Sequence, residues 1–141
     1  MARRTVLEMW AEANERVELV SPEDLAEELA SGDVLLLDTR LPVEIERRGT
    51  IAGSHPVPRQ VLEWWADPES PYFRPEGIFG DFDKRVVVFC DGGGNGAFSA
   101  VALAELGYRN VATLEGGFFA WAAAGLPISA KAVNPGSATR G

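Results

Sequence analysis

The sequence predicts an α/β fold in which a mostly parallel sheet is covered by helices on both faces. Three observations predict this class. The apolar runs VLLLD and VVVFC are typical of short strands buried on both faces. Stretches with helical periodicity or a high alanine content lie between such runs. Glycine and proline mark most of the boundaries, as short surface connections require.

The first helix is expected near the N-terminus, in an extension over residues 1–18. Thr5 and Glu8 are spaced for a capping box at its start. Four apolar side chains then recur at helical spacing: Val6, Trp10, Ala13 and Val17. We expect this face of the helix to pack on the domain through Val6, Trp10 and Ala13.

The remaining elements are expected within one domain, residues 19–129. Ser21 is a good N-cap and Gly32 a good C-terminal stop for the next helix. The order that follows is a strand (34–38), a short helix (39–49), an extended piece (51–58), a helix (61–66), a strand (86–90), a helix (96–107), a strand (110–115) and a helix (117–125). Residues 130–141 lack periodicity and are predicted to be disordered.

Composition restricts the class of function. The 141 residues suit one domain, and 46% of them are hydrophobic, enough for a sizeable core. A net charge of −8 disfavours nucleic acids and anionic membranes as partners, and any anion site must be built locally. With one cysteine and no run near the ~18 apolar residues of a membrane span, we expect a soluble cytoplasmic protein.

The only cysteine, Cys90, ends a predicted strand and is followed by a loop with glycines at 92, 93, 94 and 96. In parallel α/β sheets, sites lie beyond the carboxyl ends of the strands. Backbone N–H groups at the start of a helix stabilise a thiolate or a bound anion, and a cysteine there typically has a depressed pKa. The glycines permit positive φ, so that the loop can curl around the sulfur. The alternative is a small buried hydrophobic residue before an ordinary turn.

Three other loop chemistries fit less well. A P-loop needs Gly-Lys-Ser/Thr after the glycines, and the sequence continues NGA. Gly92, Gly94 and Ala97 fit a dinucleotide fingerprint with Glu115 about 20 residues on, but only one strand and one helix follow. A cysteine phosphatase loop would need arginine at the position of Gly96.

Two further segments extend the pattern over residues 21–128. LLLDTRLPVEIERRGTIAGSHPVP is similar to an Asp-x-Arg element followed by Gly-His-Ile-x-Gly-Ala, with Thr50 where histidine is usual. NVATLEGGFFAW is similar to Leu-x-Gly-Gly-x-x-x-Trp. Together with the cysteine loop, in this order and spacing, the chain resembles the rhodanese family of sulfurtransferases through Asp38, Arg40, Cys90, Gly116, Gly117 and Trp121.

The resemblance implies a three-layer α/β/α fold and a double displacement. The thiolate of Cys90 would take a sulfane sulfur from a donor such as thiosulfate, and the persulfide would pass it to cyanide or a thiol. No metal or organic cofactor is implied, and a homodimer or a protein sulfur acceptor is an expected partner. The implied substrate-binding loop consists of Asp91, Gly92, Gly93, Gly94, Asn95 and Gly96.

The loop departs from the family at two positions. Asn95 stands where arginine is common, and Asp91 adds a negative charge beside the sulfur. Loss of a charge-assisted hydrogen bond of about 1.5–3 kcal/mol would weaken an anionic donor roughly 10- to 100-fold. A low-turnover sulfur carrier or protein-binding module is therefore the alternative function.

Other residues are expected to support the site. Asp38 and Arg40 are predicted to form an ion pair or hydrogen bonds under the loop, and an arginine from an irregular segment can replace the missing cation: Arg48, Arg59 or Arg74. The single histidine, His55, is interpreted as a structural or surface residue. A cluster of aromatic residues is predicted to be core or pocket wall: Trp64, Trp65, Tyr72 and Phe73.

Overall fold

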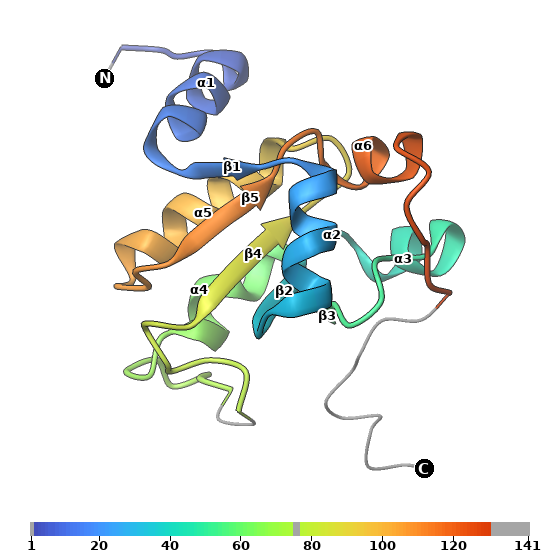
Figure 1. Cartoon of the computed structure of the whole chain (residues 1–141). Coiled ribbons are helices and arrows are strands. Elements are labelled where there is room, and N and C mark those ends of the chain that lie inside the picture. The colour runs from blue at the N-terminus through green and yellow to red at the C-terminus, as the bar shows by residue number, and fades with distance from the viewer. Residues whose placement is uncertain (1, 75–76, 131–141) are drawn as a thin grey trace.

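The sheet contains five strands, and all of its pairings are parallel (Figure 1). The structure is a computed structural model that describes residues 2–74 and 77–130. The strand order is β1-β5-β4-β2-β3, which places β4 at the centre. The strands are β1 (Glu18–Val20), β2 (Val34–Asp38), β3 (His55–Pro56), β4 (Arg85–Phe89) and β5 (Val111–Leu114). The predicted α/β class is confirmed.

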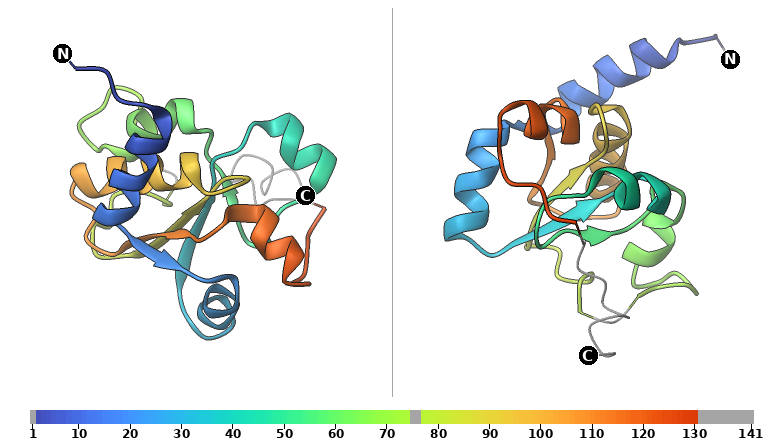
Figure 2. Two further views of the ribbon diagram at one scale, coloured as in Figure 1. Left: turned by 90° about the horizontal axis from the view of Figure 1, so that it is seen from above. Right: turned by 90° about the vertical axis from the view of Figure 1, so that its right-hand side faces the viewer.

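In the part of the chain that the structure describes, six α-helices surround the sheet: α1 (Val6–Arg16), α2 (Pro22–Ser31), α3 (Pro42–Arg48), α4 (Leu62–Ala66), α5 (Gly94–Glu105) and α6 (Gly117–Ala123), with a 3₁₀ turn, η1 (Arg59–Val61), before α4. Alternate side chains of β4 enter two separate cores. Val86 and Val88 pack with residues of α4 and α5, whereas Val87 and Phe89 pack with residues of α2 and α6. The two views of Figure 2 show these helices on opposite faces, which is the expected three-layer arrangement.

Helix α1 begins with the predicted capping box. Thr5 Oγ1 accepts from the N–H of Glu8, and Glu8 Oε1 accepts from the N–H of Thr5, both at 3.1 Å. The helix lies on α5, on the side away from the sheet (Figure 2), and its Ala13 is buried. The expectation for Val6 is wrong, because its side chain is 64% exposed at an open pocket rather than packed in the interface.

Strand β1 was not expected from the sequence. It has three residues, of which only Val20 is buried, so no alternation of polar and apolar residues marks it. Its backbone pairs with β5, with Glu18 opposite Ala112 and Val20 opposite Leu114. Pairing with a distant segment therefore creates this edge strand, which local propensity does not predict.

The C-terminal segment returns to the domain after α6. Ser129 and Thr50 exchange two backbone hydrogen bonds of 2.7 and 2.8 Å. Residues 131–141 of the predicted disordered tail lie outside the described residues. Within residues 2–74 and 77–130, no helix has the length and apolar character needed to cross a membrane.

The docking of α1 can be tested at two alanines of the same helix. Ala13→Glu places a carboxylate in the buried interface with α5, whereas Ala11→Glu places the same group in solvent. Burial of an unpaired charge is unfavourable, so we expect the backbone amides of α1 to lose protection from hydrogen exchange in Ala13→Glu only. Equal protection in both variants would show that α1 does not depend on this contact.

Candidate active site

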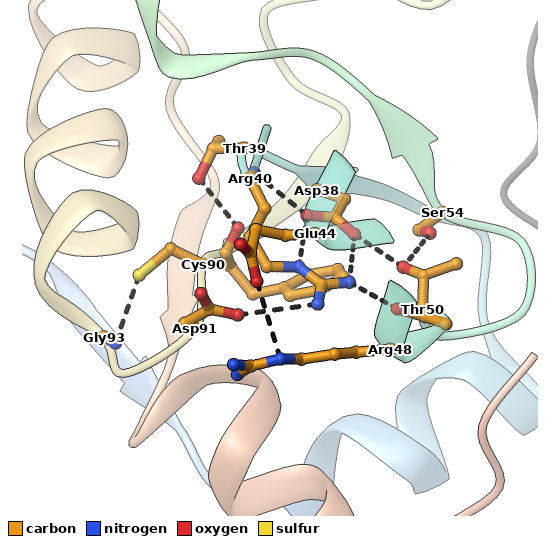
Figure 3. A network of polar contacts seen from close by, with 12 residues as sticks. Asp38, Thr39, Arg40, Glu44, Arg48, Thr50, Ser54, Cys90, Asp91 and Gly93 are labelled. Atoms are coloured by element: carbon orange, nitrogen blue, oxygen red, sulfur yellow. Dashed lines mark hydrogen bonds and ion pairs between the residues drawn. The ribbon is translucent and has the colours of Figure 1, made fainter. Parts of the chain in front are cut away.

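Cys90 lies directly after β4, at the carboxyl end of the central strand. The neighbouring strand β2 continues beside it, because the N–H of Thr39 donates to the carbonyl of Phe89 at 2.9 Å. The thiol is the only free cysteine and is 6% exposed. The backbone N–H of Gly93 donates to its Sγ at 3.1 Å (Figure 3). A backbone donor therefore faces the sulfur just before α5 begins.

Two glycines of the loop are required for different reasons. All four glycines permit positive φ, and among them Gly93 alone adopts it, with φ +110°. A Cβ on Gly96 would lie 2.6 Å from Oγ1 of Thr113. Gly96 is thus needed for the close approach of α5 to the sheet, and Gly93 for the turn that aims its N–H at the sulfur.

Helix α6 holds the loop from behind. The N–H of Phe118 donates to the carbonyl of Cys90 at 2.8 Å, and the N–H of Phe119 donates to that of Asp91 at 2.9 Å. Gly117 has φ +65°, and a Cβ there would lie 2.5 Å from the Asp91 carbonyl oxygen. The second glycine of the sequence motif, Gly117, therefore lets α6 approach the loop, a role that sequence reasoning did not assign.

The predicted ion pair between Asp38 and Arg40 is present and buried. Arg40 Nε donates to Asp38 Oδ1 at 3.0 Å, and Nη2 donates to Oδ2 at 2.7 Å. The side chain of Arg40 is 2% exposed and that of Asp38 is 0% exposed. Arg40 Nη2 also donates to the carbonyl of Gly49 at 2.7 Å, and Thr50 Oγ1 donates to Asp38 Oδ2 at 2.6 Å. Thr50 thus helps to satisfy the buried carboxylate.

The same guanidinium reaches the cysteine loop. Arg40 Nη1 lies 3.5 Å from Asp91 Oδ1 (Figure 3). The guanidinium also stacks 4.2 Å from the ring centroid of Phe118. Asp91 therefore adds a carboxylate beside the cysteine loop, as expected, and its contact with Arg40 offsets part of that charge.

Of the three arginines considered as replacement cations, only Arg59 lines the pocket in front of the cysteine. Arg48 pairs with Glu44 at 3.5 Å, and Arg74 stacks 4.0 Å over the ring of Trp65. The described lining of the pocket includes neither of them. Arg48 is thus connected to the pocket by its ion pair with Glu44, which lines the pocket.

The pocket has a volume of about 870 Å³. Its walls come from α1, the start of α3, the turn before α4 and the cysteine loop, including the exposed side chain of Asn95. Trp64 and Tyr72 are exposed and do not belong to the described lining. The other two aromatic residues of the predicted cluster, Trp65 and Phe73, pack against the core.

His55 lies in β3, outside the described pocket lining, in agreement with its interpretation as a structural or surface residue. Partial burial lowers the pKa of its imidazole below the usual value. Among residues 2–74 and 77–130, no cluster of histidine, cysteine and carboxylate side chains is arranged to hold a metal ion.

Fold and site together define a class: parallel α/β proteins in which a cysteine follows the central strand and a backbone loop surrounds its sulfur. Within that class, the chain belongs to the rhodanese-like domain family, whose family model matches residues 21–124. It is thus a member of the rhodanese-like sulfurtransferases, as its sequence motifs indicated.

Individual relatives support the same family. A sulfurtransferase of Allochromatium vinosum is 35% identical over 112 residues, which cover 79% of this chain and 94% of that protein. Thiosulfate sulfurtransferase GlpE of Actinobacillus succinogenes is 48% identical over 48 residues, or 34% of this chain and 43% of that protein.

Solved structures agree with this assignment. A Rhodopseudomonas palustris protein of unknown function, described as a possible tyrosine phosphatase, is 42% identical with a TM-score of 0.82 and covers 92% of this chain and 97% of its own. The human single-domain sulfurtransferase TSTD1 is 27% identical with a TM-score of 0.65, covering 74% of this chain and 95% of its own.

The buried ion pair predicts a large loss of stability when it is broken. Arg40→Met leaves the carboxylate of Asp38 buried without its cation, and we expect a loss of about 3–5 kcal/mol in the free energy of unfolding. Arg48→Met removes the more exposed pair with Glu44 and should cost less than about 1 kcal/mol. Urea denaturation measures both values, and equal losses would contradict the role given to the buried pair.

Proposed function

We propose that the protein is a sulfurtransferase that carries sulfane sulfur as a persulfide on Cys90. The observation that supports this most directly is the sulfur atom itself. It lines an open pocket at the carboxyl end of the central strand, with the N–H of Gly93 at 3.1 Å. A persulfide carries its negative charge on the outer sulfur, so it needs hydrogen-bond donors and open space on this side.

The proposed reaction has two displacements. In the first, the thiolate of Cys90 attacks the outer sulfur of thiosulfate. The S–S bond of the donor breaks, a new S–S bond forms on Cys90, and sulfite leaves with the electron pair of the broken bond. In the second, an acceptor such as cyanide or a thiolate attacks the outer sulfur of the persulfide. The S–S bond on Cys90 breaks, and the thiolate is restored.

The chain's own groups assist by electrostatics. Helix α5 has 12 residues and begins at Gly94, so its positive N-terminal end lies at the loop. Helix α6 engages the carbonyl oxygens of Cys90 and Asp91 on the opposite side, which keeps these negative dipoles bonded away from the pocket. Together these features stabilise the negative charge of a persulfide or an anionic donor held at the loop.

A phosphatase function is less well supported, although it is suggested in the description of the Rhodopseudomonas palustris protein. The arginine of a cysteine phosphatase loop would stand at Gly96. A Cβ at that position would already lie 2.6 Å from Thr113 Oγ1 and 3.4 Å from the Cα of Phe89. The backbone therefore leaves no room for an arginine side chain there.

The substrate-binding role of residues 91–96 belongs to this proposal, as do the supporting roles of Asp38, Arg40 and Arg48. The alternative is a low-turnover sulfur carrier, which would hold the persulfide on Cys90 for a protein partner, or a protein-binding module that has lost turnover. A homodimer, a protein sulfur acceptor and a cytoplasmic location stay predictions.

The assignment of Cys90 predicts the mass of the protein after treatment with a sulfur donor. Wild-type protein should gain one sulfur atom and lose it again on addition of cyanide, as measured by intact mass spectrometry. Cys90→Ser should gain none, because the serine hydroxyl is a far weaker nucleophile towards sulfur near neutral pH. Sulfur that stays bound to Cys90→Ser would remove the assignment, since the chain has no other cysteine.

Because Asn95 stands where arginine is common in the family, restoring an arginine at this position should increase sulfur transfer from thiosulfate. Asn95 is exposed at the start of α5 and lines the pocket, so Asn95→Arg should place a guanidinium near the thiosulfate dianion. We expect kcat/KM for thiosulfate to rise by up to about tenfold and the gain to shrink at high salt.

Ala104→Arg is the matched control, because it adds the same charge at an exposed position in the last turn of α5, outside the described pocket lining. An equal gain in both variants would mean that only the net charge matters. No gain in a folded Asn95→Arg variant would mean that Asn95 does not mark a missing anion anchor.

A further inference from the structure

Trp10 of helix α1 lies against the cysteine loop and forms part of the pocket wall. A methyl group in place of the Gly93 α-hydrogen would lie 3.5 Å from Cζ2 of this indole, and one on Gly94 would lie 4.0 Å from its Cδ2. Trp10 and Cys90 line the same pocket. The N-terminal helix, outside the segment that the family model matches, thus supplies a side chain beside the cysteine loop.

The pocket is not charged to attract an inorganic dianion. Its lining contains two arginines and two carboxylates, whose charges cancel: Arg40, Arg59, Glu44 and Asp91. Both arginines are already paired. Arg40 is bound to Asp38 and Asp91, and Arg59 Nη1 donates to Glu63 Oε1 at 2.6 Å. In a chain with a net charge of −8, this arrangement leaves a dianion with little electrostatic gain.

Apolar side chains dominate the open part of the same pocket. Val6 is 64% exposed and Leu41 is 59% exposed, and both line the pocket. Trp10 and Phe98 add two aromatic rings. A pocket of about 870 Å³ is also far larger than a small inorganic anion requires. Exposed apolar side chains that surround a reactive atom indicate a ligand with an apolar body.

We propose that the sulfur donor is a small organic persulfide, R–S–SH, whose apolar R group packs on Trp10. This inference rests on the proposed sulfur transfer at Cys90. The thiolate of Cys90 attacks the outer sulfur, the S–S bond of the donor breaks, and its electron pair leaves on R–S⁻, which takes the proton of the transferred S–H. The products are Cys90–S–S⁻ and R–SH, so one negative charge stands on each side of the reaction. Trp10 therefore determines specificity by contact with the leaving group.

The test compares benzyl persulfide with methyl persulfide and thiosulfate as donors. For wild-type protein, we expect kcat/KM to favour the benzyl over the methyl donor, and Trp10→Ala to reduce that ratio by about tenfold, as the loss of an aromatic contact implies. Thiosulfate should change by less than about twofold. Trp10→Phe should retain most of the preference. Leu7→Ala, an exposed position of α1 outside the described pocket lining, is the matched control and should leave the ratio unchanged.

A binding measurement separates this inference from the proposed function. Benzyl methyl sulfide has no transferable sulfur, so it should slow the alkylation of Cys90 by iodoacetamide in wild type and in Leu7→Ala, but not in Trp10→Ala. If Trp10→Ala lowers kcat/KM equally for all three donors, Trp10 supports the loop but does not distinguish between donors, and the inference is wrong. If no donor loads Cys90 although protection persists, sulfur transfer itself is refuted, and the donor assignment falls with it.

Discussion

The site depends on one buried ion pair, between Asp38 at the end of β2 and Arg40 two residues later. Neither charge is exposed to water, so each requires the other to offset its loss of hydration. The two-point geometry also fixes the orientation of the guanidinium, whose remaining donors reach the carbonyl of Gly49 and the carboxylate of Asp91. One side chain thereby joins the end of β2, the end of α3 and the cysteine loop.

The loop around Cys90 is shaped by its surroundings as much as by its own residues. Helix α6 engages the carbonyls of Cys90 and Asp91 from behind, and Gly117 permits that approach because it has no Cβ. On the front side, the N–H of Gly93 faces the sulfur. The carbonyl groups of Cys90 and Asp91 thus bond to α6, whereas the N–H of Gly93 faces the sulfur. An anionic sulfur species requires this arrangement of dipoles.

The chemistry of this pocket is distinct in its balance of charge and apolar surface. The arginines that line it already have carboxylate partners, and Asn95 occupies the position where the family commonly has a cation. The N-terminal helix adds Trp10 and Val6 on the open side. A sulfur-transfer loop is therefore combined with a wall from the N-terminal helix, outside the segment that the family model matches, and specificity is expected to come from that wall.

The sequence by itself determined the features that depend on neighbouring residues. The capping box at Thr5, the buried strands β2 and β4, and the cysteine loop at the end of β4 all follow from local patterns of caps, apolar runs and glycines. The Asp38–Arg40 pair was also predictable, because the two residues are close in the chain and flank a strand end. Such signals act within a few residues, so they survive without knowledge of the fold.

Only the tertiary structure decided what depends on distant segments. Strand β1 exists because its backbone pairs with β5, and the charge of Asp91 is offset because Arg40 reaches it from another element. Trp10 reaches the loop because α1 packs on α5. Each of these contacts joins residues more than 50 positions apart. Their partners are chosen by the packing of whole elements, and no local pattern records that choice.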